Sequence, residues 1–317
     1  MSTPLAAPDW LWAVFAVAAA AGQTLRNALQ RSLVDTVGTA GATHVRFLYG
    51  LPFGVLFLLL VWLAGGIVAP VVSWSFWFWL TLGASTQIIA TALMLTLMQR
   101  RSFVVSTAYI KTEPVLIAVF GFVFLDDLLS VSAVAAVVIA TAGVFALSWP
   151  RATVAAASGA TSPQPFANDG WGTAALLGIT AGATFALSVV GFRGAILALG
   201  DDPFYGRATL ALVASLALQT ALLSMWLAWR EPGRLRQLAG AWRASTLAGF
   251  TGAAASQCWF LAFSLQAAAL VRTVGLVEVL FAMMLSRRMF AQHASAREMI
   301  GIGLIIVGVA LLLNVAS

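Results

Sequence analysis

The chain has 317 residues, of which 61% are hydrophobic and 9% charged, and its mean hydropathy is +0.96. A soluble domain of this size could not bury so much apolar surface, so the composition excludes one and predicts an integral membrane protein. The net charge of +6 does not indicate nucleic-acid binding, because the arginines lie in short connections and form no patch with interleaved aromatic residues.

Ten apolar segments follow one another along the chain, each about as long as a membrane-spanning helix of roughly 20 residues. We expect helices at 10–31, 40–64, 74–98, 103–123, 131–149, 171–193, 204–229, 244–265, 268–286 and 297–315. The longest connection is rich in Ala, Ser, Thr and Pro, as is typical of a linker. The predicted organisation is a five-helix repeat at 1–150, a linker loop at 151–170 and a second five-helix repeat at 171–317.

The two halves carry an internal repeat. A shift of 165 positions brings Glu113 onto Glu278 and Gly143 onto Gly308. Because each half has an odd number of spans, the second copy would enter the bilayer in the opposite direction, as in many secondary transporters. The predicted fold class is an all-α integral membrane protein with ten transmembrane helices in two inverted five-helix repeats.

The distribution of arginines predicts the orientation of the chain. Outside the spans, the even-numbered connections and both termini hold only Arg193. Positively charged short loops stay in the cytoplasm, so we expect an inner-membrane protein with both termini extracytoplasmic. The odd-numbered connections hold Arg31, Arg100, Arg101, Arg151, Arg230, Arg234, Arg236, Arg243, Arg287, Arg288 and Arg297.

Several charged residues fall inside the predicted spans. A charge near the centre of a span costs about 2.5 kcal/mol or more, so such residues usually face a cavity or one another. Glu113 and Glu278 lie about ten residues into their spans, roughly 15 Å deep. Arg46 and Arg207 correspond under a shift of 161 and are candidates for opposite mouths of a pathway; structural pairing with a glutamate is the alternative reading.

Polar residues inside the spans complete a candidate substrate and proton pathway. Gln219 is instead expected to join helices by hydrogen bonding. Pro114 predicts a kink beside Glu113, whereas Val279 in the second copy predicts a straighter helix. The candidate pathway residues are Glu113, Glu278, Lys111, Arg46, Arg207, Gln23, Asn27, Gln87, Tyr109, Gln257 and Arg272.

The last span resembles the closing helix of small multidrug resistance proteins, since Gly301 and Gly308 are seven residues apart. Together with Thr112-Glu113-Pro114-Val115 and the run from Phe124 to Ser130, it resembles the EamA-domain branch of the drug/metabolite transporter superfamily. The resemblance implies ten helices around a central cavity, with the fifth and tenth packed peripherally. Two features depart from the resemblance. The carboxylate that small multidrug resistance proteins carry in their first helix is absent from the first span, and the arginines predict termini outside, whereas the family usually has both termini in the cytoplasm.

These patterns predict an inner-membrane secondary transporter, an exporter of small metabolites such as amino acids or small organic acids, that works by alternating access. The alternatives are an exporter of lipophilic compounds or a scaffold or channel that transports nothing. We expect no enzyme, cofactor or metal, because no nucleophile–base set or His/Cys cluster occurs. The expected partners are a small-molecule substrate, the bilayer and, as a candidate coupling ion, the proton carried by Glu113 or Glu278; the chain would be a monomer or weak homodimer.

Overall fold

The described part of the chain is built from helices. The computed structural model describes residues 7–65, 72–100, 110, 112–148, 171–200, 203–281, 284 and 296–316, and these ranges contain no strand. The elements in chain order are α1 (Leu11–Leu48), α2 (Leu51–Leu63), α3 (Trp74–Arg100), α5 (Glu113–Leu125), α6 (Val131–Ser148), α7 (Trp171–Leu197), α8 (Phe204–Arg230), α9 (Pro232–Gly240), α10 (Trp242–Leu265), α11 (Ala268–Val274), the 3-10 turn η1 (Gly275–Val277) and α13 (Ala296–Ala316). The expectation of an all-α protein is confirmed for these residues.

The helices and the outer surface have the character of a membrane protein. Four helical stretches are long and apolar enough to cross a bilayer: Leu11–Leu63, Trp74–Gln99, Leu176–Leu197 and Phe204–Arg230. Large apolar side chains such as Leu63, Val131 and Trp229 lie exposed on the outside, where water would penalise them and lipid would not. These features are compatible with a location in a bilayer.

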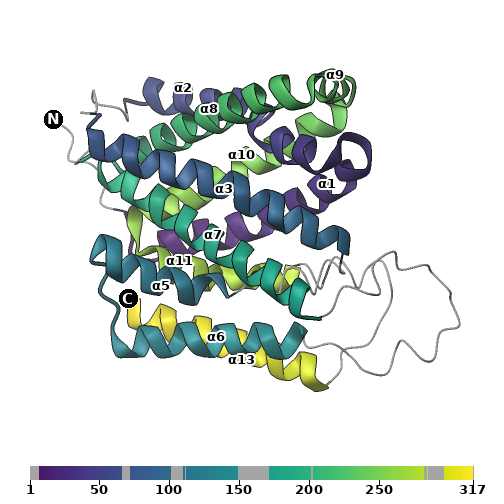
Figure 1. Ribbon diagram of the computed structural model, residues 1–317. Helices are drawn as coiled ribbons and strands as arrows, with labels where there is room; N and C mark the ends of the chain where they lie inside the picture. The colour runs from purple at the N-terminus through teal and green to yellow at the C-terminus, as the bar shows by residue number, and fades with distance from the viewer. Residues whose placement is uncertain are drawn as a thin grey trace, which may run out of the picture.

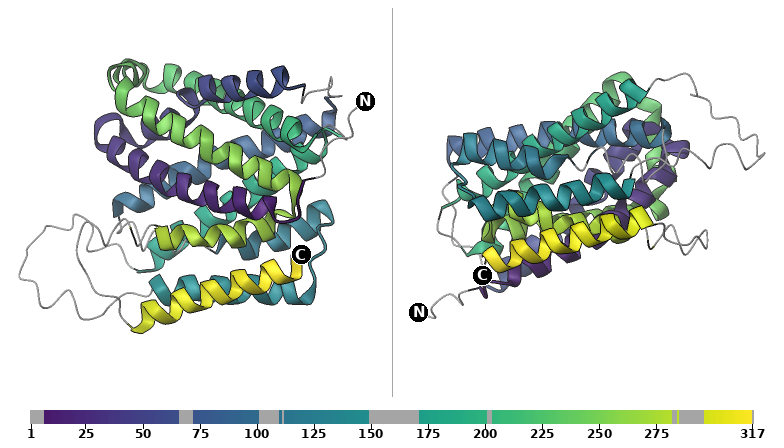
Figure 2. Two further views of the ribbon diagram at one scale, coloured as in Figure 1. Left: turned by 180° about the vertical axis from the view of Figure 1, so that it is seen from behind. Right: turned by 90° about the horizontal axis from the view of Figure 1, so that it is seen from below.

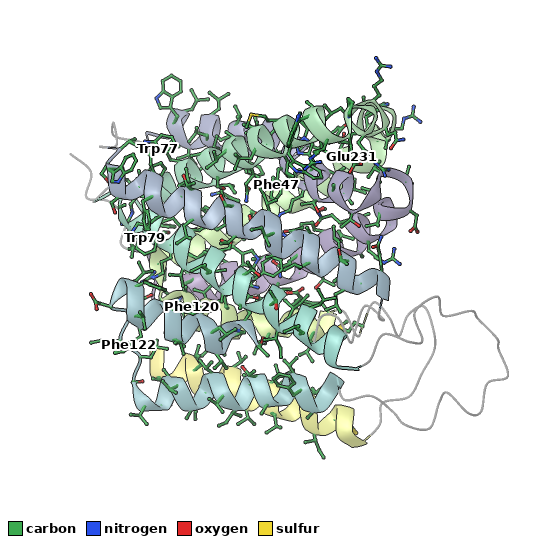
Figure 3. All side chains as sticks on the ribbon, in the orientation of Figure 1. Phe47, Trp77, Trp79, Phe120, Phe122 and Glu231 are labelled. Carbon is green, nitrogen blue, oxygen red and sulfur yellow. The ribbon has the colours of Figure 1, made fainter. Side chains whose placement is uncertain are left out.

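The helices are stacked with their axes running broadly in the same direction (Figure 1). The first residues of α1 and the last residues of α13 lie at one end, which we call the terminal end, and α9 lies at the other, the α9 end (Figures 1 and 2). Trp77 and Trp79 lie at the terminal end and Glu231 beside α9 (Figure 3). Tryptophans near the ends of apolar helices are typical of a membrane interface.

Close packing of small residues joins α6 to α13 in a peripheral layer (Figure 1). A Cβ added at Gly308 would lie 2.7 Å from the Cβ of Ala140, and one at Gly143 would lie 2.8 Å from the carbonyl oxygen of Gly301. The same kind of contact joins α3 to α7, where a Cβ on Gly191 would lie 2.6 Å from the backbone nitrogen of Gly83. Small residues therefore set the distances between these helices.

The predicted second span differs from the observed helices. α1 continues past 31 to Leu48 and is broken at Gly38, whose φ of +73° favours glycine. α2 begins only at Leu51, so the segment that carries Arg46 belongs to α1. The short helix α9 was not predicted; the hydroxyl of Tyr49 donates a hydrogen bond to its Leu238 carbonyl at 2.9 Å.

The helices that carry the two predicted acids are irregular next to them. α5 begins at Glu113, with Pro114 in its first turn, where a missing N–H costs no hydrogen bond. Residues 103–109 and 111 of the predicted span lie outside the described residues, so the expected kink stays a prediction. In the second copy the expected straight helix is interrupted, because α11 gives way to η1 directly before Glu278.

Candidate functional site

A polar cavity lies in the middle of the bundle, with a volume of about 40 Å³ open to the centres of water-sized molecules. Its walls come from α1, α3, α5, α7, α10 and α11, together with Glu278 directly after η1. Its charged side chains are almost fully buried: Arg26, Glu113 and Glu278 are each 2% exposed or less. The charges and amides that line it are Gln23, Arg26, Asn27, Arg46, Gln87, Glu113, Arg272 and Glu278.

Glu113 forms a buried ion pair with Arg272. Nη2 of Arg272 donates to Oε2 of Glu113 at 2.6 Å, although 159 positions separate the two residues. The guanidinium also lies over the ring of Trp259, 4.3 Å from its centroid, in a cation–π contact. The carboxylate lies in the first turn of α5, where the helix dipole favours negative charge. Its second oxygen, Oε1, accepts no hydrogen bond from the part of the chain that the structure describes.

Glu278 is bound mainly by neutral amides of α1. Gln23 donates to its Oε2 at 2.7 Å and Asn27 donates to its Oε1 at 3.2 Å. The hydroxyl of Thr24 donates to its backbone carbonyl at 3.4 Å. The indole N–H of Trp259 in turn donates to Gln23 at 2.9 Å. One connected set of contacts therefore runs from Glu278 through Gln23 and Trp259 to Arg272 and Glu113.

Arg26 and Arg46 give the cavity an excess of positive charge. Arg26 donates to the side-chain oxygen of Asn27 at 2.9 Å. Within the described chain Arg46 donates only long hydrogen bonds, to Thr91 at 3.4 Å and Ser256 at 3.5 Å, and its guanidinium lies 5.3 Å from the centroid of the Phe47 ring. Nη1 of Arg26 and Nε of Arg46 are buried and have no hydrogen-bond partner among the described residues.

Among the described residues, the charges that act most on Arg46 are those of two other arginines, Arg26 and Arg272. The described lining of the cavity holds three arginines and two glutamates, a formal charge of +1. A buried cation without a counter-charge is costly. The arrangement therefore suits an anionic group placed beside Arg46.

Apart from Ser256, the rest of the described cavity wall is apolar. Methionine and aromatic side chains adapt to flat or irregular organic groups. An inorganic ion would leave this part of the wall without a partner, so the cavity suits an organic anion better. The apolar lining consists of Met94, Met98, Ile110, Phe185, Val189, Phe192, Trp259, Phe260 and Phe263.

The structure brings most of the predicted site residues together. Seven of them line the cavity: Glu113, Glu278, Arg46, Arg272, Gln23, Asn27 and Gln87. Tyr109 and Lys111 lie outside the described residues. The expected joining role of Gln219 is confirmed, since it donates to Gln87 at 2.8 Å and to the carbonyl of Ala84 at 3.3 Å.

Two predicted site residues do not line this cavity. Arg207 lies in the first turn of α8 and donates to the carbonyl of Gly200 at the terminal end, at 2.9 Å. Gln257 donates to the hydroxyl of Thr209 at 2.8 Å. Arg46 and Arg207 lie in different surroundings, because Arg46 is buried in the bundle after the break at Gly38 while Arg207 lies at a helix end; their placement at opposite mouths of a pathway stays a prediction.

The cavity residues that sequence reasoning left out of the candidate pathway include Arg26, Trp259 and Ser256. Arg26 had a usable signal, because it is a charge inside the first span, three positions after Gln23 and therefore on a neighbouring part of the helix surface. Trp259 had none, since an apolar ring in a span is ordinary.

A polar clamp lies between the cavity and the terminal end. Arg193 of α7 donates to both carboxylate oxygens of Asp127, at 2.8 and 2.9 Å. Its Nη1 also donates to the backbone carbonyls of Phe263 and Gln266, at 2.7 Å each. Since the Phe263 side chain lines the cavity, the clamp joins three segments on the terminal side of the site.

Comparison with known proteins identifies the fold alone. No protein-family model and no curated protein matches the sequence. A solved structure described as "Crystal structure of protein" is similar over 96% of this chain and 94% of its own length, with a TM-score of 0.66 and 15% sequence identity. The arrangement of helices over nearly the whole chain is therefore one that a solved structure shares.

Proposed function

We propose that this protein is a secondary transporter of small anionic or zwitterionic metabolites, such as amino acids or organic acids, that works by alternating access. The observation that carries the proposal is the buried central cavity, in which the charges that act most on Arg46, among the described residues, are those of Arg26 and Arg272, and part of the wall is aromatic. Buried charges are expensive, and inside membrane proteins they mark pathways for solutes and ions. A scaffold would have no use for them.

Helix packing supports the further proposal of two inverted five-helix repeats. If α1, α3 and α6 correspond to α7, α10 and α13, exchange of the halves turns the α1–α10 contact into the α7–α3 contact. Both contacts are extensive. The same exchange leaves the α6–α13 contact unchanged and, if α2 corresponds to α8, the α2–α8 contact as well. Such self-matching contacts are expected along a two-fold axis between the repeats. Together with the sequence motifs, this pattern favours membership of the EamA-domain branch and a role in export from the cell through the inner membrane.

A second function, export of lipophilic compounds, is favoured by the Met- and Phe-rich part of the wall. The arginines argue against lipophilic cations, because burying a third positive group beside Arg26 and Arg46 would be costly. Substrate charge therefore separates the two functions.

A binding screen tests the proposal. Purified protein in detergent would be heated with amino acids, organic acids, neutral solutes and lipophilic cations, since a ligand of the folded state raises the apparent Tm. We expect stabilisation by carboxylates and uptake of the same compounds into proteoliposomes. Stabilisation by lipophilic cations alone would favour the second function, and no response to any compound would contradict both.

Matched arginine variants locate the binding site. Arg46→Ala removes a charged hydrogen-bond donor and should weaken carboxylate binding roughly 10- to 100-fold. Arg207→Ala removes an arginine outside the cavity and should leave binding unchanged. Equal losses in both variants would contradict the placement of the site.

A further inference from the structure

The two buried carboxylates of the cavity have unlike hydrogen-bond partners. Glu113 is bound through Oε2 by Arg272, and its Oε1 has no partner in the described ranges. Both side-chain oxygens of Glu278 accept hydrogen bonds from amides. Their equivalent positions in the repeat therefore do not imply equivalent roles.

The orientation of the Gln23 amide follows from its neighbour Trp259. An indole N–H can only donate, so Gln23 must turn its oxygen toward Trp259, at 2.9 Å. Its NH₂ group then faces Oε2 of Glu278 at 2.7 Å. The donor-only indole therefore determines the orientation of the Gln23 amide.

The Asn27 amide is oriented in the same way by Arg26. A guanidinium can only donate, and Arg26 donates through Nε and Nη2 to Oδ1 of Asn27, at 3.2 and 2.9 Å. The NH₂ group of Asn27 therefore faces Oε1 of Glu278 at 3.2 Å. Two donor-only side chains thus force two amides to present N–H groups to one carboxylate.

This arrangement accepts a carboxylate and disfavours a carboxylic acid. Protonation of Glu278 would replace two hydrogen bonds to a charged acceptor by weaker bonds to a neutral one. The negative charge of Glu278 also acts on Arg26. Oε1 of Glu113, by contrast, is buried and accepts no hydrogen bond from any described residue.

We propose that Glu278 is a fixed negative charge and positioning residue, held ionised by Gln23 and Asn27, and that Glu113 is the carboxylate that binds the transported molecule. This division of roles rests on the proposed transport function. Only Glu113, and not its repeat counterpart Glu278, would then bind and release the transported molecule. The negative charge of Glu278 could therefore be transferred to a neighbouring position such as 27 or 23 without loss of binding, whereas the carboxylate of Glu113 could not be replaced.

Moving the charge tests the assignment of Glu278. Glu278→Gln should lower the apparent Tm by roughly 5 °C, because the NH₂ group of the new glutamine must face the NH₂ group of either Gln23 or Asn27. In Asn27→Asp/Glu278→Gln, the new carboxylate can accept from Arg26 and from the amide introduced at position 278, which restores every donor–acceptor pair. We expect this double variant to recover the Tm and the stabilisation by carboxylate ligands.

Controls keep the test decisive if one variant folds poorly. Asn27→Asp alone should destabilise the protein, since two carboxylates would face each other. Gln23→Glu/Glu278→Gln moves the charge to the other amide and should recover as well. Failure of both folded double variants to recover ligand binding, or an unchanged Glu278→Gln variant, would overturn the assignment.

Glu113→Gln provides the matched arm. This variant should remain folded but bind the ligand at least 10-fold more weakly, as seen in its smaller ligand-induced rise in Tm. Adding Asn27→Asp should not restore ligand binding. Full ligand response in Glu113→Gln would overturn its role. The ligand-free Tm values test the Glu278 network even if no compound binds the unmodified protein, so failure of the proposed function would be recognised separately.

Discussion

At the scale of single residues, the cavity depends on charges that compensate one another across distant parts of the chain. Arg272 is shared by an ion pair with Glu113 and a ring contact with Trp259, from three different helices. Breaking a buried pair leaves an uncompensated charge, which costs more than the pair itself contributes.

Replacement of Arg272 by methionine keeps most of the side-chain volume and leaves Glu113 unpaired. We expect a loss of about 3–5 kcal/mol in unfolding free energy. Adding Glu113→Gln should recover most of that loss, because the remaining amide is neutral. Denaturant unfolding of the two single variants and the double variant measures the coupling. Additive losses would show that the two side chains do not interact.

Sequence reasoning reached part of this site. It located Glu113 and Glu278 by depth along a span, because depth follows directly from position in a helix. It could not pair Glu113 with Arg272 or Glu278 with Gln23, since these contacts depend on the rotation and crossing of helices far apart in sequence. Arg46 was included in the predicted site, but the break at Gly38 that precedes it was not predicted.

At the scale of helices, small residues decide which pairs approach closely. Gly308 faces α6, where an added Cβ would lie 2.7 Å from both the Cβ and the backbone nitrogen of Ala140. Gly303 lies on the same helix, but nothing lies within 4 Å of the position its Cβ would take. The two glycines therefore form a matched pair with opposite surroundings.

Gly308→Ala should destabilise the protein by about 1–3 kcal/mol, because the backbone atoms it meets cannot move away without separating α6 from α13. Gly303→Ala should be neutral or stabilise by roughly 0.5–1 kcal/mol, since alanine favours the helix. Thermal unfolding of both variants in the same detergent makes the comparison. Equal effects would indicate that the α6–α13 contact does not limit stability.

Most helices follow from the sequence because long apolar segments have few alternatives in a bilayer. α3, α6, α8 and α13 begin and end within two residues of the predicted bounds. The interruptions were harder to predict: a left-handed glycine at Gly38 and the 3-10 turn before Glu278 are local choices that tertiary contacts stabilise.

At the scale of the whole molecule, the arginine distribution predicts which end faces the cytoplasm. We expect the terminal end to be extracytoplasmic and the α9 end cytoplasmic. Leu128 is 81% exposed between α5 and α6 at the terminal end. Gly233 lies on α9, with nothing within 4 Å of the position of an added Cβ. Both positions therefore accept a labelled cysteine.

In a Cys258→Ala background, a membrane-impermeant thiol reagent added to intact cells should label Leu128→Cys and not Gly233→Cys. Permeabilised cells should label both, which controls for reactivity. Labelling of Gly233→Cys alone in intact cells would place the termini in the cytoplasm and invert the orientation that the arginines predict.

The clamp between Arg193 and Asp127 would resist an opening of the bundle at the terminal end. It ties α7 to the segment after α5 and to the end of α10, next to a residue of the cavity wall. A conformation open toward the terminal end would have to separate these segments. Asp127→Asn removes the ionic part of the clamp and should favour that conformation.

The expected effect is a labelling rate about 10-fold higher at a cavity cysteine, the factor that corresponds to about 1.4 kcal/mol. Ser256→Cys, in the Cys258→Ala background, provides that cysteine, since Ser256 lines the cavity. Glu231→Gln is the matched control, because it breaks the Glu231–Arg234 pair at the α9 end, whose atoms are also 2.8 Å apart. An increase with Asp127→Asn alone supports a clamp that closes the terminal side. Equal increases in both variants would mean that loss of either ion pair loosens the whole bundle, and no increase would remove the clamp from the transport cycle.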